Sequence, residues 1–159
     1  MAVVNGTNGD DQFGAALFTF DGQADQAFGF EGDDWIWASS GRDSYDGGGG
    51  VDLVFYESAT FTNGVTVNLT NATVNGVAPG TADTRGFGTH TLIGIELLHG
   101  SNADDALYFG DEPNVQNYSF DRAGDDFVQA SQNGDDLGHD FNVGSGNDTY
   151  VGSPGANWN

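Results

Sequence analysis

Regularly spaced aspartates are the side chains of this sequence with the clearest chemical potential. Asp25, Asp34, Asp43 and Asp52 lie nine residues apart, and stretches that contain glycine precede the last three. Carboxylate and backbone carbonyl oxygens are the hard ligands that Ca²⁺ prefers, with roughly six to eight of them around one ion. The spacing therefore predicts calcium sites that are formed by turns of the chain.

Four glycines are expected to contribute to these sites through their backbone. They are Gly29, Gly32, Gly47 and Gly49. Because glycine has no Cβ, it readily adopts positive φ angles, which can direct successive carbonyl groups toward one centre. Glu31 lies in the same turn as Gly29 and Gly32 and is a further candidate ligand.

Similar turns with glycine and aspartate recur on both sides of this block. They add the candidate metal ligands Asp11, Asp105, Asp126, Asp136 and Asp148. Asp136 is the weakest of these, because the repeat frame around it is not defined. The acidic residues directly before four of the candidates are expected to face solvent, since adjacent side chains of a turn usually diverge; they are Asp10, Asp33, Asp104 and Asp125.

Short strands in a nine-residue repeat are the elements that must position these aspartates. Units 29–37, 38–46 and 47–55 follow the pattern G-G-x-G-x-D-x-U-x, where U is a large apolar residue, and this pattern is typical of calcium-binding repeats. Six residues of each unit form a turn, and three form a strand whose central side chain points inward. Two units make one coil, so alternate turns stack on the same edge and consecutive turns lie on opposite edges.

This geometry predicts which aspartates meet. Asp34 is expected to face Asp52 on one edge, and Asp25 is expected to face Asp43 on the other. The second site matches the pattern less well, because alanine and serine replace the first two glycines of unit 38–46.

The repeats resemble those of the RTX (repeats-in-toxin) family of calcium-binding proteins. Segments 64–69 and 92–101 are similar to the stretch that often separates repeat blocks in that family, so the likeness covers nearly the whole chain. The resemblance implies an all-β fold, a parallel β-roll or β-solenoid, in which several Ca²⁺ ions are held by sixth-position aspartates and by carbonyls of both turns. It also implies type I secretion to the cell surface or the extracellular space, without a cleaved N-terminal signal, and folding there by calcium.

One continuous domain with three parts is expected. An alternation of Val65, Val67 and Leu69 with polar residues predicts a half-buried strand, residues 74–88 are expected to form a loop or hairpin, and residues 92–98 a buried strand. No amphipathic helix is predicted. The three parts are an N-terminal repeat block at 1–55, a strand and loop insertion at 56–99, and a C-terminal repeat block at 100–159.

The charge balance limits the possible partners. The chain has 159 residues, with 24 Asp and Glu against 3 Lys and Arg, and a formal net charge of −21. Such a field repels nucleic acid and anionic membranes and attracts divalent cations or a basic protein. There is no cysteine, and no apolar run approaches the ~20 residues of a membrane span. We therefore expect folding to be coupled to metal binding and the metal-free chain to be largely disordered.

Catalysis is not favoured by the pattern. Paired carboxylates can act as acid and base in glycoside hydrolysis, but the adjacent aspartates here are expected to diverge. His90, His99 and His139 are scattered and form no His-Glu-x-x-His motif, and Ser39 and Ser44 lack the context of a nucleophilic serine. We therefore expect a protein that is not an enzyme.

Exposed aromatic residues leave two alternatives open. Trp35 and Trp37 flank the inward residue Ile36, and Phe55 and Tyr108 occupy corresponding outer positions. Either another segment covers these rings, or they form a contact surface for another subunit or a polysaccharide, because aromatic residues are enriched in interface cores.

Two functions follow from these expectations. The favoured one is a structural or self-assembling extracellular component of a surface layer, matrix or filament, because the ends of an uncapped coil stack invite association. The alternative is a noncatalytic calcium-binding module of a larger secreted enzyme, adhesin or toxin. Family members usually end in a nonrepetitive secretion segment, whereas residues 155–159 still resemble a repeat, so a truncated module and an unusual complete protein are both compatible with the sequence.

Overall fold

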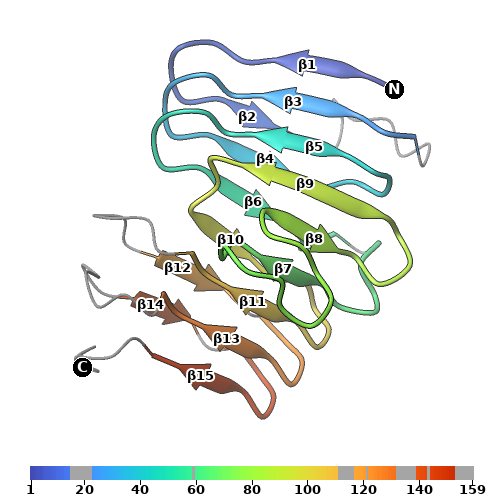
Figure 1. Ribbon diagram of the computed structural model, residues 1–159, viewed down its shortest axis with the longest axis vertical. Coiled ribbons are helices and arrows are strands. Elements are labelled where there is room, and N and C mark those ends of the chain that lie inside the picture. Colours follow the sequence, from blue (N-terminus) through green and yellow to red (C-terminus); the bar gives the residue numbers. More distant parts are fainter. Residues whose placement is uncertain are drawn as a thin grey trace.

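The computed structural model describes residues 1–14, 23–58, 60–110, 117–120, 122–131, 139–142 and 144–152. These residues form strands, turns and bends but no helix, as the sequence predicts. In this part of the chain, no helix is therefore present that could cross a membrane. Figure 1 shows the strands stacked in coils from β1 to β15.

The strands form two sheets, one with nine strands and one with six. The nine-stranded sheet has the order β1-β3-β5-β9-β8-β7-β11-β13-β15, and the six-stranded sheet the order β14-β12-β10-β6-β4-β2. The strands are β1 (Val3–Asn5), β2 (Gln12–Phe13), β3 (Gln26–Phe28), β4 (Trp35–Trp37), β5 (Ser44–Asp46), β6 (Leu53–Phe55), β7 (Thr66–Asn68), β8 (Thr81–Asp83), β9 (Thr89–Ile93), β10 (Leu97–His99), β11 (Ala106–Tyr108), β12 (Asn117–Phe120), β13 (Phe127–Gln129), β14 (His139–Asn142) and β15 (Thr149–Val151).

Most of the chain passes alternately from one sheet to the other. Strands of one sheet pair in parallel with the strand one coil further on, for example Trp35 opposite Leu53 in β4 and β6. This coil is 18 residues long, whereas the coil before it is 23 residues long. Coils near the C-terminus have 21 and 22 residues. The nine-residue period therefore holds in the central repeat block, and these other coils contain more residues.

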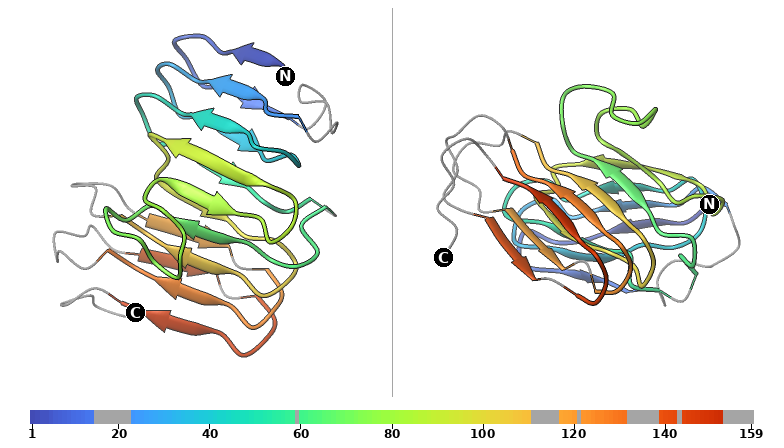
Figure 2. Two further views of the ribbon diagram at one scale, coloured as in Figure 1. Left: turned by 45° about the vertical axis from the view of Figure 1, so that its right-hand side comes forward. Right: turned by 90° about the horizontal axis from the view of Figure 1, so that it is seen from below.

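Insertion 56–99 contains the antiparallel part of the nine-stranded sheet. Strand β8 pairs antiparallel with both β7 and β9, and the loop between β7 and β8 projects from the sheet (Figure 2). Strand β9 pairs in parallel with β5, and β7 pairs in parallel with β11, so the insertion continues both repeat blocks. The predicted hairpin at 74–88 thus corresponds to β8 and its flanking turns.

Two details of the insertion differ from the sequence prediction. Residues 92–98 are not one buried strand, because a turn at Gly94 separates β9 from β10 in the other sheet, and Ile93 is half exposed. The strand at Thr66–Asn68 is buried on both faces. Asn68 is fully buried there, and its amide compensates for the loss of water by donating hydrogen bonds to the carbonyls of Ala72 and Val77, at 2.8 and 2.9 Å.

The core lies between the two sheets. The central residue of a three-residue strand points inward, as alternation along a strand requires, and is fully buried in β4, β5 and β6, where it is Ile36, Tyr45 and Val54. Leu107 and Val128 take the same place in the C-terminal coils. Each coil therefore adds about one large side chain from each sheet to a continuous apolar column.

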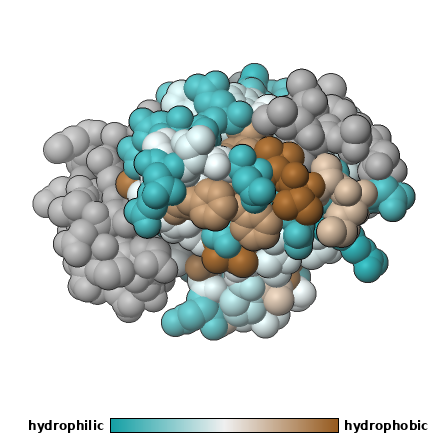
Figure 3. Space-filling view, turned by 90° about the horizontal axis from the view of Figure 1, so that it is seen from above, coloured by the Kyte–Doolittle hydropathy of each residue, from teal (hydrophilic) through white to brown (hydrophobic). Residues whose placement is uncertain are grey.

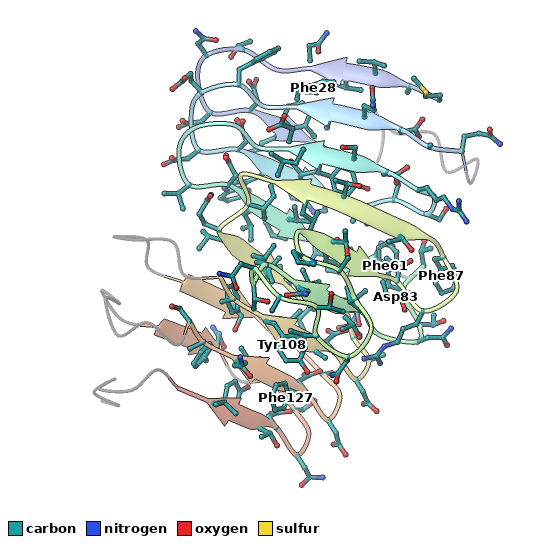
Figure 4. The ribbon with its side chains drawn as sticks, in the orientation of Figure 1. Phe28, Phe61, Asp83, Phe87, Tyr108 and Phe127 are labelled. Atoms are coloured by element: carbon teal, nitrogen blue, oxygen red, sulfur yellow. The ribbon has the colours of Figure 1, made fainter. Side chains whose placement is uncertain are left out.

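The outward aromatic residues are covered to different degrees. Tyr108 is buried: the Asn75 side chain from the projecting loop donates a hydrogen bond to its hydroxyl at 2.6 Å, and its ring packs against Phe127 (Figure 4). On the six-stranded sheet, Trp37 stacks on Phe55 at a centroid distance of 4.5 Å. Trp35 remains 45% exposed, so the insertion covers Tyr108 but leaves Trp35 accessible.

Candidate metal centre

A column of acidic side chains follows the edge where the chain passes from the nine-stranded to the six-stranded sheet. The N–H of Asp11 donates to Asp34 Oδ1 at 2.7 Å, and the N–H of Asp34 donates to Asp52 Oδ1 at 2.8 Å. The N–H of Asp52 donates to Glu96 Oε2 at 2.9 Å. The predicted meeting of Asp34 and Asp52 is therefore confirmed, and each carboxylate also joins one coil to the previous one.

The opposite edge carries the second column. The N–H of Asp25 donates to Asp43 Oδ1 at 3.0 Å, which confirms that these two residues meet. Further along this edge, the N–H of Asp105 donates to Asp126 Oδ1 at 2.7 Å, and that of Asp126 to Asp148 Oδ1 at 3.2 Å. Asp11, Asp34 and Asp52 thus share one edge, and Asp25, Asp43, Asp105, Asp126 and Asp148 share the other. Asp136 lies outside the described residues.

The aspartates directly before those of the two columns face solvent, as predicted, and they also join neighbouring coils; they are Asp10, Asp33, Asp104 and Asp125. Asp10 Oδ1 accepts a hydrogen bond from the N–H of Asp33, and Asp33 Oδ1 accepts one from the N–H of Val51. Asp104 Oδ1 accepts from the N–H of Asp125 in the same way. In the pairs 33–34, 104–105 and 125–126, the first carboxylate therefore binds the backbone of the next coil and the second binds that of the previous one.

Three carboxylates of these columns are buried and incompletely paired. Asp25, Asp34 and Asp52 are fully buried, and the Oδ2 atom of each has no hydrogen-bond partner. A buried ionised carboxylate is strongly unfavourable unless a cation or hydrogen-bond donors compensate its charge. For Asp25, the N-terminal ammonium group lies 3.7 Å from Oδ1, so the Oδ2 atoms of Asp34 and Asp52 are the positions of these three at which the chain itself supplies no cation.

Burial and mutual repulsion shift the pKa values of these acids. Burial raises the pKa of Asp52 to about 7, and the nearby charges of Glu96 and Asp34 add to the shift. Burial is also the main cause that raises the pKa of Asp34, with further repulsion from Asp11. The pKa of Asp105 rises to about 6, again through burial. An adjacent cation would favour the ionised form of all three side chains.

In turns 29–34 and 47–52, the first residue must be glycine because no space is left for a side chain. A Cβ on Gly29 would overlap Asp34 Oδ2 and the carbonyl oxygen of Gly47, and a Cβ on Gly47 would overlap Asp52 Oδ2 in the same way. In both turns, a carboxylate oxygen and the carbonyl oxygen of the following turn therefore occupy the space in which a Cβ atom would lie. The sequence predicts positive φ angles for these glycines. Gly32 has one, but Gly29, Gly47 and Gly49 do not, so lack of space and not backbone conformation explains glycine at positions 29 and 47.

The side chain of Glu31 is placed differently from the buried carboxylates. It is exposed, and its Oε2 would lie 3.2 Å from a Cβ on Gly49. Gly32 has a φ of +114° and packs against the backbone of Gly9 in the previous coil. Of the sequence-predicted ligands in turn 29–34, Asp34 is thus the one that carries a buried, unpaired oxygen.

Hydroxyl side chains at the second turn position are the functional residues that the motif analysis missed. Thr7 Oγ1 donates to Asp11 Oδ2 at 3.0 Å, and Ser101 Oγ donates to Asp105 Oδ1 at 2.8 Å. Ser39 Oγ donates to Asp43 Oδ2 at 2.7 Å. The signal for them in the sequence is a Ser or Thr four residues before the aspartate, where the repeat pattern has its second glycine.

A buried polar network surrounds Asp43. Tyr45 Oη donates to Asp43 Oδ2 at 3.0 Å, and His90 Nε2 lies 3.8 Å from the same oxygen. Ser39, Asp43, Tyr45 and His90 are all 1% exposed or less. Although these residues include the types of a hydrolytic triad, no substrate can reach them, and the network satisfies a buried carboxylate.

The donor set of the turns fits a calcium ion better than a transition metal. Asp34 and Asp52 offer carboxylate oxygens, and the turns around them offer backbone carbonyls, which together are the ligand types of Ca²⁺. Among the described residues, no three His, Asp or Glu side chains converge on one point. An ion between these turns would therefore take two carboxylates at most and the rest of its ligands from carbonyls and water.

Comparison of the chain with protein-family models and with curated proteins finds no match.

Proposed function

We propose that this protein is a calcium-binding β-roll whose folding depends on the ion and whose role is structural. The stacked, buried and unpaired Oδ2 atoms of Asp34 and Asp52 carry this proposal. In the proposed site, these two carboxylates and the carbonyls of turns 29–34 and 47–52 hold Ca²⁺. The bound ion would supply the positive charge that neutralises them.

Hydrogen bonds within the chain and its net charge both support this proposal. The carboxylates of Asp34 and Asp52 each bind the backbone of the previous coil through Oδ1, so Oδ2 is held at a fixed place in its turn. The net charge of −21 opposes compaction without counter-ions. Calcium is scarce inside cells and abundant outside them, so a calcium-dependent fold suits a protein exported unfolded by type I secretion and acting at the cell surface or in the extracellular matrix.

A calcium titration followed by circular dichroism tests the coupling of folding to metal. We expect a disordered spectrum in EDTA and a β spectrum in Ca²⁺, with each tenfold increase in free calcium above the dissociation constant adding about 1.4 kcal/mol of stability per bound ion. Mg²⁺ at equal ionic strength is the control, because it screens charge equally but prefers a small octahedral site. A β spectrum that persists in excess EDTA would refute the proposal.

We propose that the coil stack associates with further copies through its ends. Strands β1 and β2 are the outermost strands of their sheets at one end, and Val3 in β1 is 52% exposed. Figure 3 views this end, where hydrophobic side chains gather between hydrophilic ones. An outermost strand with an apolar surface favours pairing with another strand.

Electron microscopy and sedimentation with saturating Ca²⁺ test the association. We expect calcium-dependent polymers, and we expect Val3→Lys to shift them to monomers because a charged edge strand resists pairing. Thr91→Lys is the matched control, since Thr91 is an exposed residue in the interior of the same sheet. Monomers at every concentration would contradict self-association and favour a calcium-binding module of a larger exported protein.

A further inference from the structure

The turns that carry the aspartates are of two kinds, which differ in their second residue and in their backbone. In turns 29–34 and 47–52, the second residues are Phe30 and Gly48, with φ angles of +82° and +97°. We call these two the open turns. In turns 6–11, 38–43 and 100–105, the second residue is a Ser or Thr without a positive φ, and we call these the hydroxyl turns.

In a hydroxyl turn, the second residue donates hydrogen bonds to the aspartate carboxylate of the same turn. In turn 6–11, the N–H and the hydroxyl of Thr7 both donate to Asp11 Oδ2, at 2.6 and 3.0 Å. In turn 100–105, Ser101 gives its N–H to Asp105 Oδ2 at 2.6 Å and its hydroxyl to Oδ1 at 2.8 Å. Hydrogen bonds to an ionised carboxylate are stronger than those between neutral groups, so these turns compensate the charge without an ion.

Turn 38–43 reaches the same result with an additional donor. Ser39 Oγ and Tyr45 Oη both donate to Asp43 Oδ2, at 2.7 and 3.0 Å. The N–H of Ser39 instead donates to Tyr45 Oη at 2.9 Å, so the tyrosine hydroxyl joins the turn backbone to the carboxylate. This turn lies on the edge opposite to Asp34 and Asp52.

Open turns leave the corresponding oxygen unpaired. Phe30 and Gly48 carry no side-chain donor, and Oδ2 of Asp34 and of Asp52 has no hydrogen-bond partner although both residues are fully buried. The two open turns are also joined directly to one another, because the N–H of Gly49 donates to the carbonyl of Phe30 and the N–H of Gly32 donates to the carbonyl of Gly49, both at 2.8 Å.

We propose that, of these five turns, only the open pair 29–34 and 47–52 binds Ca²⁺, through Asp34 and Asp52, and that a second-position hydroxyl makes the other three turns independent of metal. This inference rests on the proposed calcium function and assigns it to one edge of the central coils. Asp11, Asp43 and Asp105 then act as hydrogen-bonding groups of the fold and not as ligands.

Terbium luminescence in the full chain tests the assignment. Tb³⁺ substitutes for Ca²⁺ and is sensitised by a nearby indole, and Trp35 directly follows Asp34. We expect Asp52→Asn to weaken Tb³⁺ binding by at least roughly tenfold, as loss of a metal-site group does. Asp11→Asn is the matched control, because Asp11 is the sixth residue of the hydroxyl turn next to Asp34, and it should leave the affinity unchanged.

Three outcomes separate the inference from the proposed function. An equal loss of affinity in folded Asp11→Asn would overturn the distinction between turns. Unchanged affinity in Asp52→Asn would overturn the assignment to the open pair. If the wild-type chain binds neither Tb³⁺ nor Ca²⁺, the proposed function itself fails.

A measurement on the wild-type chain removes any dependence on variants that fail to fold. In an NMR titration with Gd³⁺, amide signals near the ion broaden first. We expect early broadening in turns 29–34 and 47–52 and later broadening in turns 38–43 and 100–105, which lie on the opposite edge. Simultaneous broadening at both edges at equal Gd³⁺ would contradict the inference.

Discussion

Gly47→Ala is expected to lower the free energy of unfolding by about 3 kcal/mol or more, since overpacking of a rigid site is costly. The added methyl group would overlap Asp52 Oδ2 and the carbonyl oxygen of Gly94. Neither atom can move easily, because Asp52 is fully buried and its Oδ1 accepts a hydrogen bond from the backbone of Asp34 at 2.8 Å. Urea unfolding at saturating calcium measures the loss.

Gly49→Ala in the same turn is the matched control. A Cβ on Gly49 would lie 3.2 Å from Glu31 Oε2, the far end of an exposed and flexible side chain. Neither Gly47 nor Gly49 has a positive φ, so the two variants differ in the space available and not in backbone strain. We expect Gly49→Ala to change stability by no more than about 0.5 kcal/mol, as is usual for surface positions. Equal losses in both variants would show that glycine is needed here for another reason.

The period of the aspartates was sufficient to predict how the central coils stack. Turns two units apart must share an edge if each unit crosses once between sheets, and this places Asp34 next to Asp52 and Asp25 next to Asp43. The inward direction of Ile36 followed from alternation along a short strand, and Ile36 is fully buried. These features depend on local spacing, which the sequence displays directly.

Features that depend on contacts between distant residues could not be predicted in this way. The hairpin of β8 inserts between β9 and β7, and nothing in the local pattern specifies that pairing. The coil before the central block contains 23 residues and two coils near the C-terminus contain 21 and 22, and the nine-residue repeat does not predict these lengths. In the repeat pattern, Ser39 is only a departure from glycine, whereas in the structure its hydroxyl donates a hydrogen bond to the carboxylate of Asp43.

His90 is expected to make the protein acid-sensitive. It is fully buried between the rings of Tyr45, Tyr56 and Phe61, and Figure 4 shows Phe61 beside Phe87 at this edge. Burial lowers the pKa of His90 from its usual 6.5 to about 4, although Asp43 Oδ2 lies 3.8 Å from Nε2. Desolvation of the buried ring is the main cause of this shift, and it outweighs the opposing effect of the Ser39 backbone.

The depressed pKa fixes the direction of the pH dependence. Above pH 6.5, His90 is neutral in both the folded and the unfolded chain, and its contribution to stability is fully present. Between pH 6.5 and 4, the unfolded chain takes up the proton first. Stability is therefore lost as the pH falls through this window, by roughly 3 kcal/mol in total. Buried carboxylates with raised pKa values act in the opposite direction, because their protonated form is favoured in the fold and acid stabilises it.

A non-titrating variant separates these opposing contributions. Wild type and His90→Gln contain the same carboxylates, so the difference between their unfolding free energies at about pH 7.5 and about pH 4.5, at fixed free calcium, isolates the histidine. We expect the wild type to lose roughly 2 to 3 kcal/mol more than the variant over this interval. His99→Gln should differ less from the wild type, since His99 is only half-buried on the outer face of the six-stranded sheet. Parallel pH profiles for wild type and His90→Gln would mean that His90 is protonated within the fold and paired with Asp43.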